Sequence, residues 1–77
     1  MSRIKIGVVT AYFPKISMAE VELRYDLFAG EYITIGDHRT KVNYLQIEND
    51  RVDKAHPGET VGIKTDFVVK IGDEVCK

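Results

Sequence analysis

The stretch Ala55-His56-Pro57-Gly58-Glu59-Thr60-Val61-Gly62-Ile63-Lys64 joins a proline–glycine turn to an alternating strand. Its first seven residues follow the order apolar, any, any, Gly, acidic, any, apolar. The same order occurs in Leu27-Phe28-Ala29-Gly30-Glu31-Tyr32-Ile33 and again in Val69-Lys70-Ile71-Gly72-Asp73-Glu74-Val75. Three copies in 77 residues predict that one turn design is used repeatedly to build the fold.

Gly30, Gly58 and Gly72 mark the structural turns of this pattern. Glycine adopts positive φ angles at little steric cost, so it suits the tight part of a turn. We expect the acidic residue that follows to stay in water, and the apolar residue two positions later to enter the core. Each copy should therefore start a strand.

Length and composition predict one folded domain, residues 1–77. Hydrophobic residues make up 44% of the chain and charged residues 30%, a balance that argues against disorder. Eleven Lys and Arg against twelve Asp and Glu give a net charge of −1, which does not indicate a strongly basic nucleic-acid-binding protein. A domain this small buries only about 60% of its unfolded surface, so a partner would help to stabilise it.

The single cysteine and the hydropathy pattern bear on location. Cys76 has no partner for an internal disulfide, which favours a reducing compartment. No stretch approaches the ~20 apolar residues of a membrane-spanning helix, and the N-terminus has no apolar signal core. We expect a cytoplasmic protein that does not bind a membrane.

Alternation of apolar and polar residues predicts strands from the N-terminus onward. The first strand, residues 4–13, should change face near Val8 and Val9. Pro14 should end it, because proline cannot donate a hydrogen bond to a strand ladder. Residues 19–23 then alternate cleanly, so we expect a hairpin with its turn at residues 13–15.

The later strands are shorter and separated by turn signals. They are expected at Tyr32–Ile35, Arg39–Ile47, Thr60–Thr65 and Glu74–Cys76. Leu27 or Phe28 should plug one end of the core. The alternation slips between Tyr44 and Leu45, which predicts a β-bulge, and the densely polar stretch Glu48–Lys54 should be an exposed loop.

The sum of these elements predicts an all-β fold. Met18–Phe28 can also be drawn as a helix, but strict alternation through Leu23 favours a strand. Short strands with turn signals every 8 to 12 residues or so are typical of small antiparallel sandwiches and barrels, and closure removes exposed sheet edges. We predict a closed six-stranded antiparallel Greek-key β-barrel.

Turns and core positions along nearly the whole chain carry a family resemblance. They are Thr40-Lys41-Val42, Leu45-Gln46-Ile47-Glu48, Val52, Ala55, Pro57–Ile63 and Gly72–Val75, with Gly7-Val8-Val9-Thr10 and Leu27–Ile35 upstream. This pattern resembles the second domain of the translational GTPases, the β-barrel that follows the GTPase domain in elongation factor Tu. It is also similar to a C-terminal barrel of collagenase-like peptidases, and to small stand-alone barrels of matching length.

The resemblance implies a binding module. The chain has no Gly-x-x-x-x-Gly-Lys-Ser/Thr loop, so we expect it to bind no nucleotide by itself and to need no cofactor. In elongation factor Tu the barrel helps to hold the aminoacyl end of transfer RNA, on the strand that here contains Gln46 and Glu48 and near Thr60. The residues here differ from that family's usual ones, so we assign no pocket residue.

No catalytic or metal-binding residue is predicted. His38, His56 and Cys76 lack the short spacing of metal ligands, so we interpret the histidines as surface turn residues. Asp50 and Asp53 can be paired as carboxylates, but an exposed charged loop explains them equally well. A barrel filled by its own side chains offers little room for a shielded catalytic pocket.

Aromatic and basic residues outline a candidate surface for RNA or a protein partner. The candidates are Tyr12, Phe13, Lys15, Arg39, Lys41, Tyr44, Lys54 and His56. At the hairpin tip an aromatic ring could stack on a base while Lys15 meets a phosphate, or Phe13 could simply cover the barrel end. Arg39 and Lys41 should share one face if the alternation continues, where they could also serve as edge protection.

Two functions follow from these expectations. The first is a non-catalytic binding module that contacts RNA or a protein of the translation apparatus, such as a ribosome-associated protein. The alternative is an accessory barrel that docks on a separately encoded peptidase-like enzyme. A small hydrolase would need a pocket that the sequence does not show.

Overall fold

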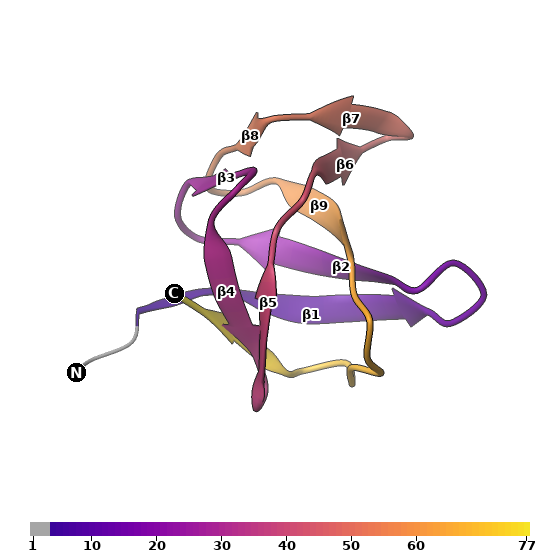
Figure 1. Cartoon of the computed structure of the whole chain (residues 1–77). Coiled ribbons are helices and arrows are strands. Elements are labelled where there is room, and N and C mark those ends of the chain that lie inside the picture. Colours follow the sequence, from indigo (N-terminus) through magenta and orange to yellow (C-terminus); the bar gives the residue numbers. More distant parts are fainter. Residues whose placement is uncertain (1–3) are drawn as a thin grey trace.

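The computed structural model describes residues 4–77, and in these residues every regular element is a β-strand (Figure 1). The strands are β1 (Lys5–Phe13), β2 (Met18–Leu23), β3 (Leu27–Phe28), β4 (Tyr32–Ile35), β5 (His38–Lys41), β6 (Leu45–Ile47), β7 (Asp50–Val52), β8 (Lys54–Ala55), β9 (Thr60–Lys64) and β10 (Glu74–Cys76). All strand pairs are antiparallel. The prediction of an all-β, antiparallel fold without the Met18–Phe28 helix is confirmed.

The strands form a curled half-barrel. Eight of them make one sheet in the order β5-β4-β10-β1-β2-β9-β6-β7, while β3 and β8 pair separately. Figure 1 shows this sheet curving from β5 around to β7, with β3 and β8 side by side at one end. No strand pair joins the outer strands β5 and β7 within residues 4–77, so a closed six-stranded Greek-key barrel is not confirmed.

The interior of the curl is filled by aliphatic side chains. The largest fully buried ones are Ile6, Leu23, Leu27, Ile33, Ile35, Leu45 and Ile63. Burying a side chain of this kind contributes about 1.5–3 kcal/mol relative to leaving it in water. Leu27 is the expected plug of the core, whereas Phe28 points outward and is 44% exposed.

The three turn glycines adopt the conformation that the sequence predicts. The φ angles of Gly30, Gly58 and Gly72 are 95°, 91° and 97°. In each turn the residue after the glycine donates its N–H to the carbonyl two positions before the glycine, over 3.0–3.2 Å. A positive φ at the third position of such a turn is the mark of type II, which also favours proline at the second position, where Pro57 lies.

The acidic residue of each turn folds back instead of staying fully in water, which corrects the sequence expectation. Its carboxylate accepts a hydrogen bond from the backbone N–H three residues earlier. The pairs are Glu31 with Phe28 (2.8 Å), Glu59 with His56 (2.6 Å) and Asp73 with Lys70 (3.0 Å). The N–H of Gly58 then donates to Leu23 in β2, that of Gly72 to Val9 in β1, and that of Gly30 to Val42 just after β5. Each turn is thus locked on itself and tied to a distant part of the chain.

The first hairpin also agrees with prediction. β1 pairs with β2 from Gly7 opposite Leu23 to Phe13 opposite Met18, with Pro14 just outside the ladder. The pairing shifts register between Val9 and Ala11, close to the predicted change of face at Val8 and Val9.

Two predictions between Tyr44 and Lys54 are wrong. The slip at Tyr44–Leu45 is not a bulge within one strand, because residues 42–44 lie outside β5 and β6 and the chain there changes partners from β4 to β9. The stretch Glu48–Lys54 is not a loop either, since β6 and β7 form a hairpin and β8 begins at Lys54. The hairpin turns on two residues with positive φ, Glu48 (49°) and Asn49 (71°).

Candidate binding surfaces

The tip of the β1–β2 hairpin carries the first group of sequence-predicted surface residues. Phe13 is 45% exposed at the end of β1, and Lys15 is exposed in the turn. Tyr12 differs, because it is partly buried and packs against the hydrophobic core. The tip therefore presents one of the two predicted aromatic rings to solvent, together with the lysine.

The second group lies along the sheet edge. Arg39 and Lys41 are both exposed on the outer strand β5, and the Arg39 guanidinium lies 5.0 Å from the centre of the Tyr32 ring. Tyr44 lies beyond the end of β5, and its ring is covered by the Arg51 guanidinium at 4.1 Å. Tyr44 and Arg39 thus belong to two separate cation–π pairs.

Lys54 and His56 lie at the opposite end of the molecule from the hairpin tip, as Figure 1 shows for β8. Lys54 is paired in register with Phe28, and His56 Nδ1 lies 3.4 Å from an Asp26 carboxylate oxygen. The structure therefore distributes the predicted surface residues over separate places and does not gather them into one patch.

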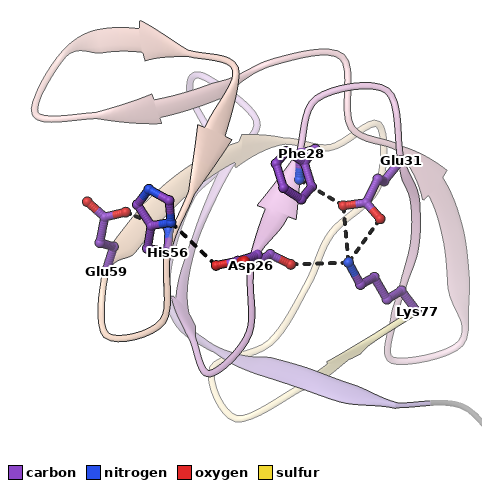
Figure 2. Close-up of polar contacts among 6 residues, drawn as sticks. All are labelled: Asp26, Phe28, Glu31, His56, Glu59 and Lys77. Carbon is purple, nitrogen blue, oxygen red and sulfur yellow. Dashed lines mark hydrogen bonds and ion pairs between the residues drawn. The ribbon is translucent and has the colours of Figure 1, made fainter.

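A polar cluster near His56 ties Lys77 to the turn Phe28–Glu31, the first of the three glycine turns (Figure 2). Lys77 Nζ lies 2.9 Å and 3.1 Å from the two carboxylate oxygens of Glu31, and it donates to the carbonyl oxygen of Asp26 at 3.1 Å. Glu31 also accepts the N–H of Phe28 in the turn. Since these contacts hold a turn and a chain end in place, the cluster is structural.

The electrostatics of Glu31 agree with this role. Partial burial acts to raise the pKa of Glu31, but the hydrogen bonds from Lys77 and the Phe28 N–H, with the charge of Lys77, outweigh it. The pKa of Glu31 therefore lies below its ordinary value of 4.5. A carboxylate that is held ionised in this way is a poor proton donor at neutral pH.

A groove that the sequence did not predict lies between the first hairpin and the β6–β7 turn. Its volume is about 270 Å³. Phe13, Ile16 and Met18 line one part of it, and Glu20, Gln46 and Glu48 supply polar side chains. We call this feature the hairpin groove.

A glycine in the middle of β9 leaves room for the hairpin groove. Gly62 pairs with Glu20 on one side and with Gln46 on the other, so the three residues form a row across β2, β9 and β6. A Cβ atom at Gly62 would lie 3.0 Å from Met18 Sδ and 3.6 Å from Gln46 Cβ. The visible sequence signal was a glycine between the apolar residues of an otherwise regular strand, which often marks a close approach to the backbone.

In the part of the chain that the structure describes, no group of three or more His, Cys, Asp or Glu side chains is arranged to hold a metal ion. His38 instead stacks on Phe67, with 4.4 Å between ring centres, and Cys76 is a half-buried free thiol. Residues 4–77 also contain no helix that is long and apolar enough to cross a membrane.

Comparison with solved structures identifies a similar fold. The chain superposes on the C-terminal domain of a Geobacillus thermoleovorans protein described as a U32 peptidase, with a TM-score of 0.92 and 21% identity. The match covers 97% of this chain and 100% of that domain. The two share one fold. A second crystal structure of the same domain gives a TM-score of 0.86 with 19% identity, over 94% of this chain and 89% of that one.

Sequence comparison points in the same direction. The chain is 38% identical over 78 aligned positions to an uncharacterized protease of Methanocaldococcus jannaschii, a match that covers 95% of this chain. It spans only 19% of the length of that relative. No family model matches the chain.

Of the two resemblances that the sequence suggested, these relatives favour the peptidase barrel over elongation factor Tu domain 2. The proteins matched are of the protease type, so the similarity to a peptidase C-terminal barrel is supported at the level of the fold. The assignment to elongation factor Tu domain 2, with RNA or a ribosome-associated protein as partner, receives no support from them.

Proposed function

We propose that this chain is a non-catalytic accessory domain that docks on a U32-type peptidase. The observation that carries the proposal is the superposition of almost the whole chain on the complete C-terminal domain of a U32 peptidase, at a TM-score of 0.92. A fold that forms a separate domain beside a peptidase is suited to an auxiliary role. The protease relative from M. jannaschii supports the same association.

The use made of the acidic residues supports a non-catalytic role. Glu31, Glu59 and Asp73 are engaged in locking turns, and Glu31 is held ionised by Lys77. General acid–base catalysis needs a carboxyl group whose pKa is close to the working pH, which is the reverse of the shift at Glu31.

We place the docking surface on the connection between β9 and β10. Val68 and Ile71 are each 73% exposed there, more than the other large apolar side chains exposed in residues 4–77. Val69 between them is buried, so the connection is anchored to the core while its apolar neighbours face outward. Exposed apolar side chains on an anchored segment are typical of protein interfaces.

Affinity capture with identification of the bound protein tests the proposal. The tagged chain, incubated with a lysate of its own source, should recover a U32-type peptidase. The double variant Val68→Asp with Ile71→Asp should lose it, whereas Phe28→Asp, which puts one charge on an exposed apolar side chain in β3, outside this connection, should keep it. Recovery of ribosomal proteins without a peptidase would overturn the proposal in favour of the translation apparatus.

A further inference from the structure

The hairpin groove is lined by both apolar and acidic side chains. Its apolar part is formed by Phe13, Ile16 and Met18, and its acidic part by Glu20 and Glu48. Among residues 4–77, no lysine or arginine lines it. The groove therefore combines an apolar wall with a local excess of negative charge.

In the described part of the chain, no ion pair neutralises Glu20 or Glu48. Within residues 4–77 the ion pairs are Lys5 with Glu74, His56 with Asp26 and Lys77 with Glu31, and none involves Glu20 or Glu48. Neither carboxylate locks a turn in the way that Glu31 and Glu59 do.

Two lysines on the strands and turn that border the groove, Lys64 and Lys15, are not part of its lining. Lys64 pairs with Met18 at the end of β9, and Lys15 is exposed in the hairpin turn. Neither belongs to the lining of the groove, and neither is within ion-pair distance of Glu20 or Glu48 in the described residues. Glu20 and Glu48 can therefore pair with a positive charge on a ligand.

The backbone of the groove floor is also shaped for close approach. Gly62 lies in the centre of the sheet, where a glycine weakens a strand and contributes no side chain to packing. Its missing Cβ keeps the space between Glu20 and Gln46 open, since even a methyl group there would press on Met18.

We propose that the hairpin groove binds a lysine or arginine side chain presented by an extended segment of a partner protein. The long aliphatic stem of such a side chain packs on apolar surface while its charged end stays in a polar environment. Here the stem lies against Phe13, Ile16 and Met18, and the cation meets Glu20 and Glu48. The groove is lined by residues of this chain, so this proposal does not rest on the peptidase as partner.

Peptide titration monitored by amide chemical shifts tests the site. The probes are capped pentapeptides with alanines around a central arginine, lysine or norleucine, the last of which keeps the stem and lacks the charge. The arginine and lysine peptides should shift the amides of Glu20, Glu48 and Gly62. The norleucine peptide should bind about fivefold to tenfold more weakly, as expected for two solvent-accessible ion pairs.

Variants separate charge from shape. Glu20→Gln with Glu48→Gln should weaken the arginine peptide about fivefold to tenfold, and Gly62→Ala should weaken all three peptides by filling the floor. Glu22→Gln, the same replacement as Glu20→Gln and on the same strand but outside the groove, should alter binding by less than about twofold. Dispersed amide spectra show that each variant is folded.

Ionic strength adds a second readout. Raising it from about 0.01 M to about 0.1 M shortens the screening length from roughly 30 Å to roughly 10 Å, so binding of the charged peptides should weaken and that of norleucine should not. Equal binding of the arginine and norleucine peptides, or no amide shifts at the groove with any of them, would overturn the proposal. So would a folded Glu20→Gln, Glu48→Gln variant that binds the arginine peptide as tightly as the parent.

Discussion

Replacement of Gly58 by alanine tests the turn design that recurs in this chain. An alanine Cβ at this position would have no atom within 4 Å, so the change introduces no clash. The backbone φ of 91° remains, and forcing an L-residue into such a conformation costs about 1–2 kcal/mol. The loss of glycine entropy from the unfolded chain offsets about 0.4–1 kcal/mol of this cost.

The net expectation for Gly58→Ala is a loss of about 1 kcal/mol in the free energy of unfolding. A 77-residue domain is stable by about 4–12 kcal/mol, and a change of 1 kcal/mol corresponds to a Tm shift of about 4–8 °C at this size. Gly58→Val should cost more, because a β-branched side chain is strongly disfavoured at positive φ. Gly58→Asn should cost least, since asparagine tolerates this region.

Urea unfolding followed by circular dichroism measures these differences, with the slope m reporting whether the unfolded state has changed. Gly30→Ala and Gly72→Ala serve as internal repeats, because a Cβ at either site also meets nothing within 4 Å and φ is 95° and 97°. All three should give similar losses. Equal stability of Gly58→Val and the parent, or losses that differ widely among the three alanine variants, would refute the reasoning.

Three further predictions concern other contacts. Glu31→Gln should destabilise the fold by about 1 kcal/mol at pH 7. Because the pKa of Glu31 is lowered in the folded state, this loss of stability should be present above pH 4.5 and shrink as the pH falls through the folded pKa. Urea unfolding of the variant and the parent at several pH values measures it. Gly7→Ala should cost about 1–3 kcal/mol, since its Cβ would lie 2.5 Å from Glu22 O, and an unchanged urea midpoint would exclude the clash. Asn49→Gly should raise the thermal midpoint slightly, because both residues of the β6–β7 turn have positive φ and Asn-to-Gly relieves one of them; a lower midpoint would contradict the turn assignment.

The turns could be predicted from sequence because their geometry is dictated locally. Gly58 and the acid after it combine a positive φ with a carboxylate that reaches back three residues, and both requirements fall within one short segment. The same holds for the first hairpin, where Pro14 ends β1. The sequence pattern did not predict that the acidic residue accepts a hydrogen bond from the backbone N–H at the start of its own turn.

The β6–β7 hairpin was not predicted because its turn lacks the glycine that usually marks a two-residue hairpin turn. Glu48 and Asn49 both take positive φ, but no glycine marks the position, and the surrounding residues are as polar as those of a loop. The change of partners after β5 was read as a bulge for a related reason. Periodicity records which face a residue occupies, but it does not record which strand lies beside it.

The hairpin groove could not be predicted because it is made by long-range pairing. Glu20, Gln46 and Gly62 come from three strands, and only the register across β2, β9 and β6 brings them into one row. For the predicted surface residues, closeness in sequence did not bring a shared contact. Tyr44 and Arg39 are close in sequence, yet they form cation–π pairs with different partners.

The most direct test of the proposed role uses the protease relative from M. jannaschii, to which the chain is 38% identical. The relative is prepared intact and without the segment that matches this chain, and isothermal titration calorimetry measures binding of the chain to each. The proposal predicts a complex with the shortened enzyme and none with the intact enzyme, whose own matching segment already occupies the place on the enzyme where this chain would dock. Absence of binding to the shortened enzyme, or equal binding to both, would contradict it.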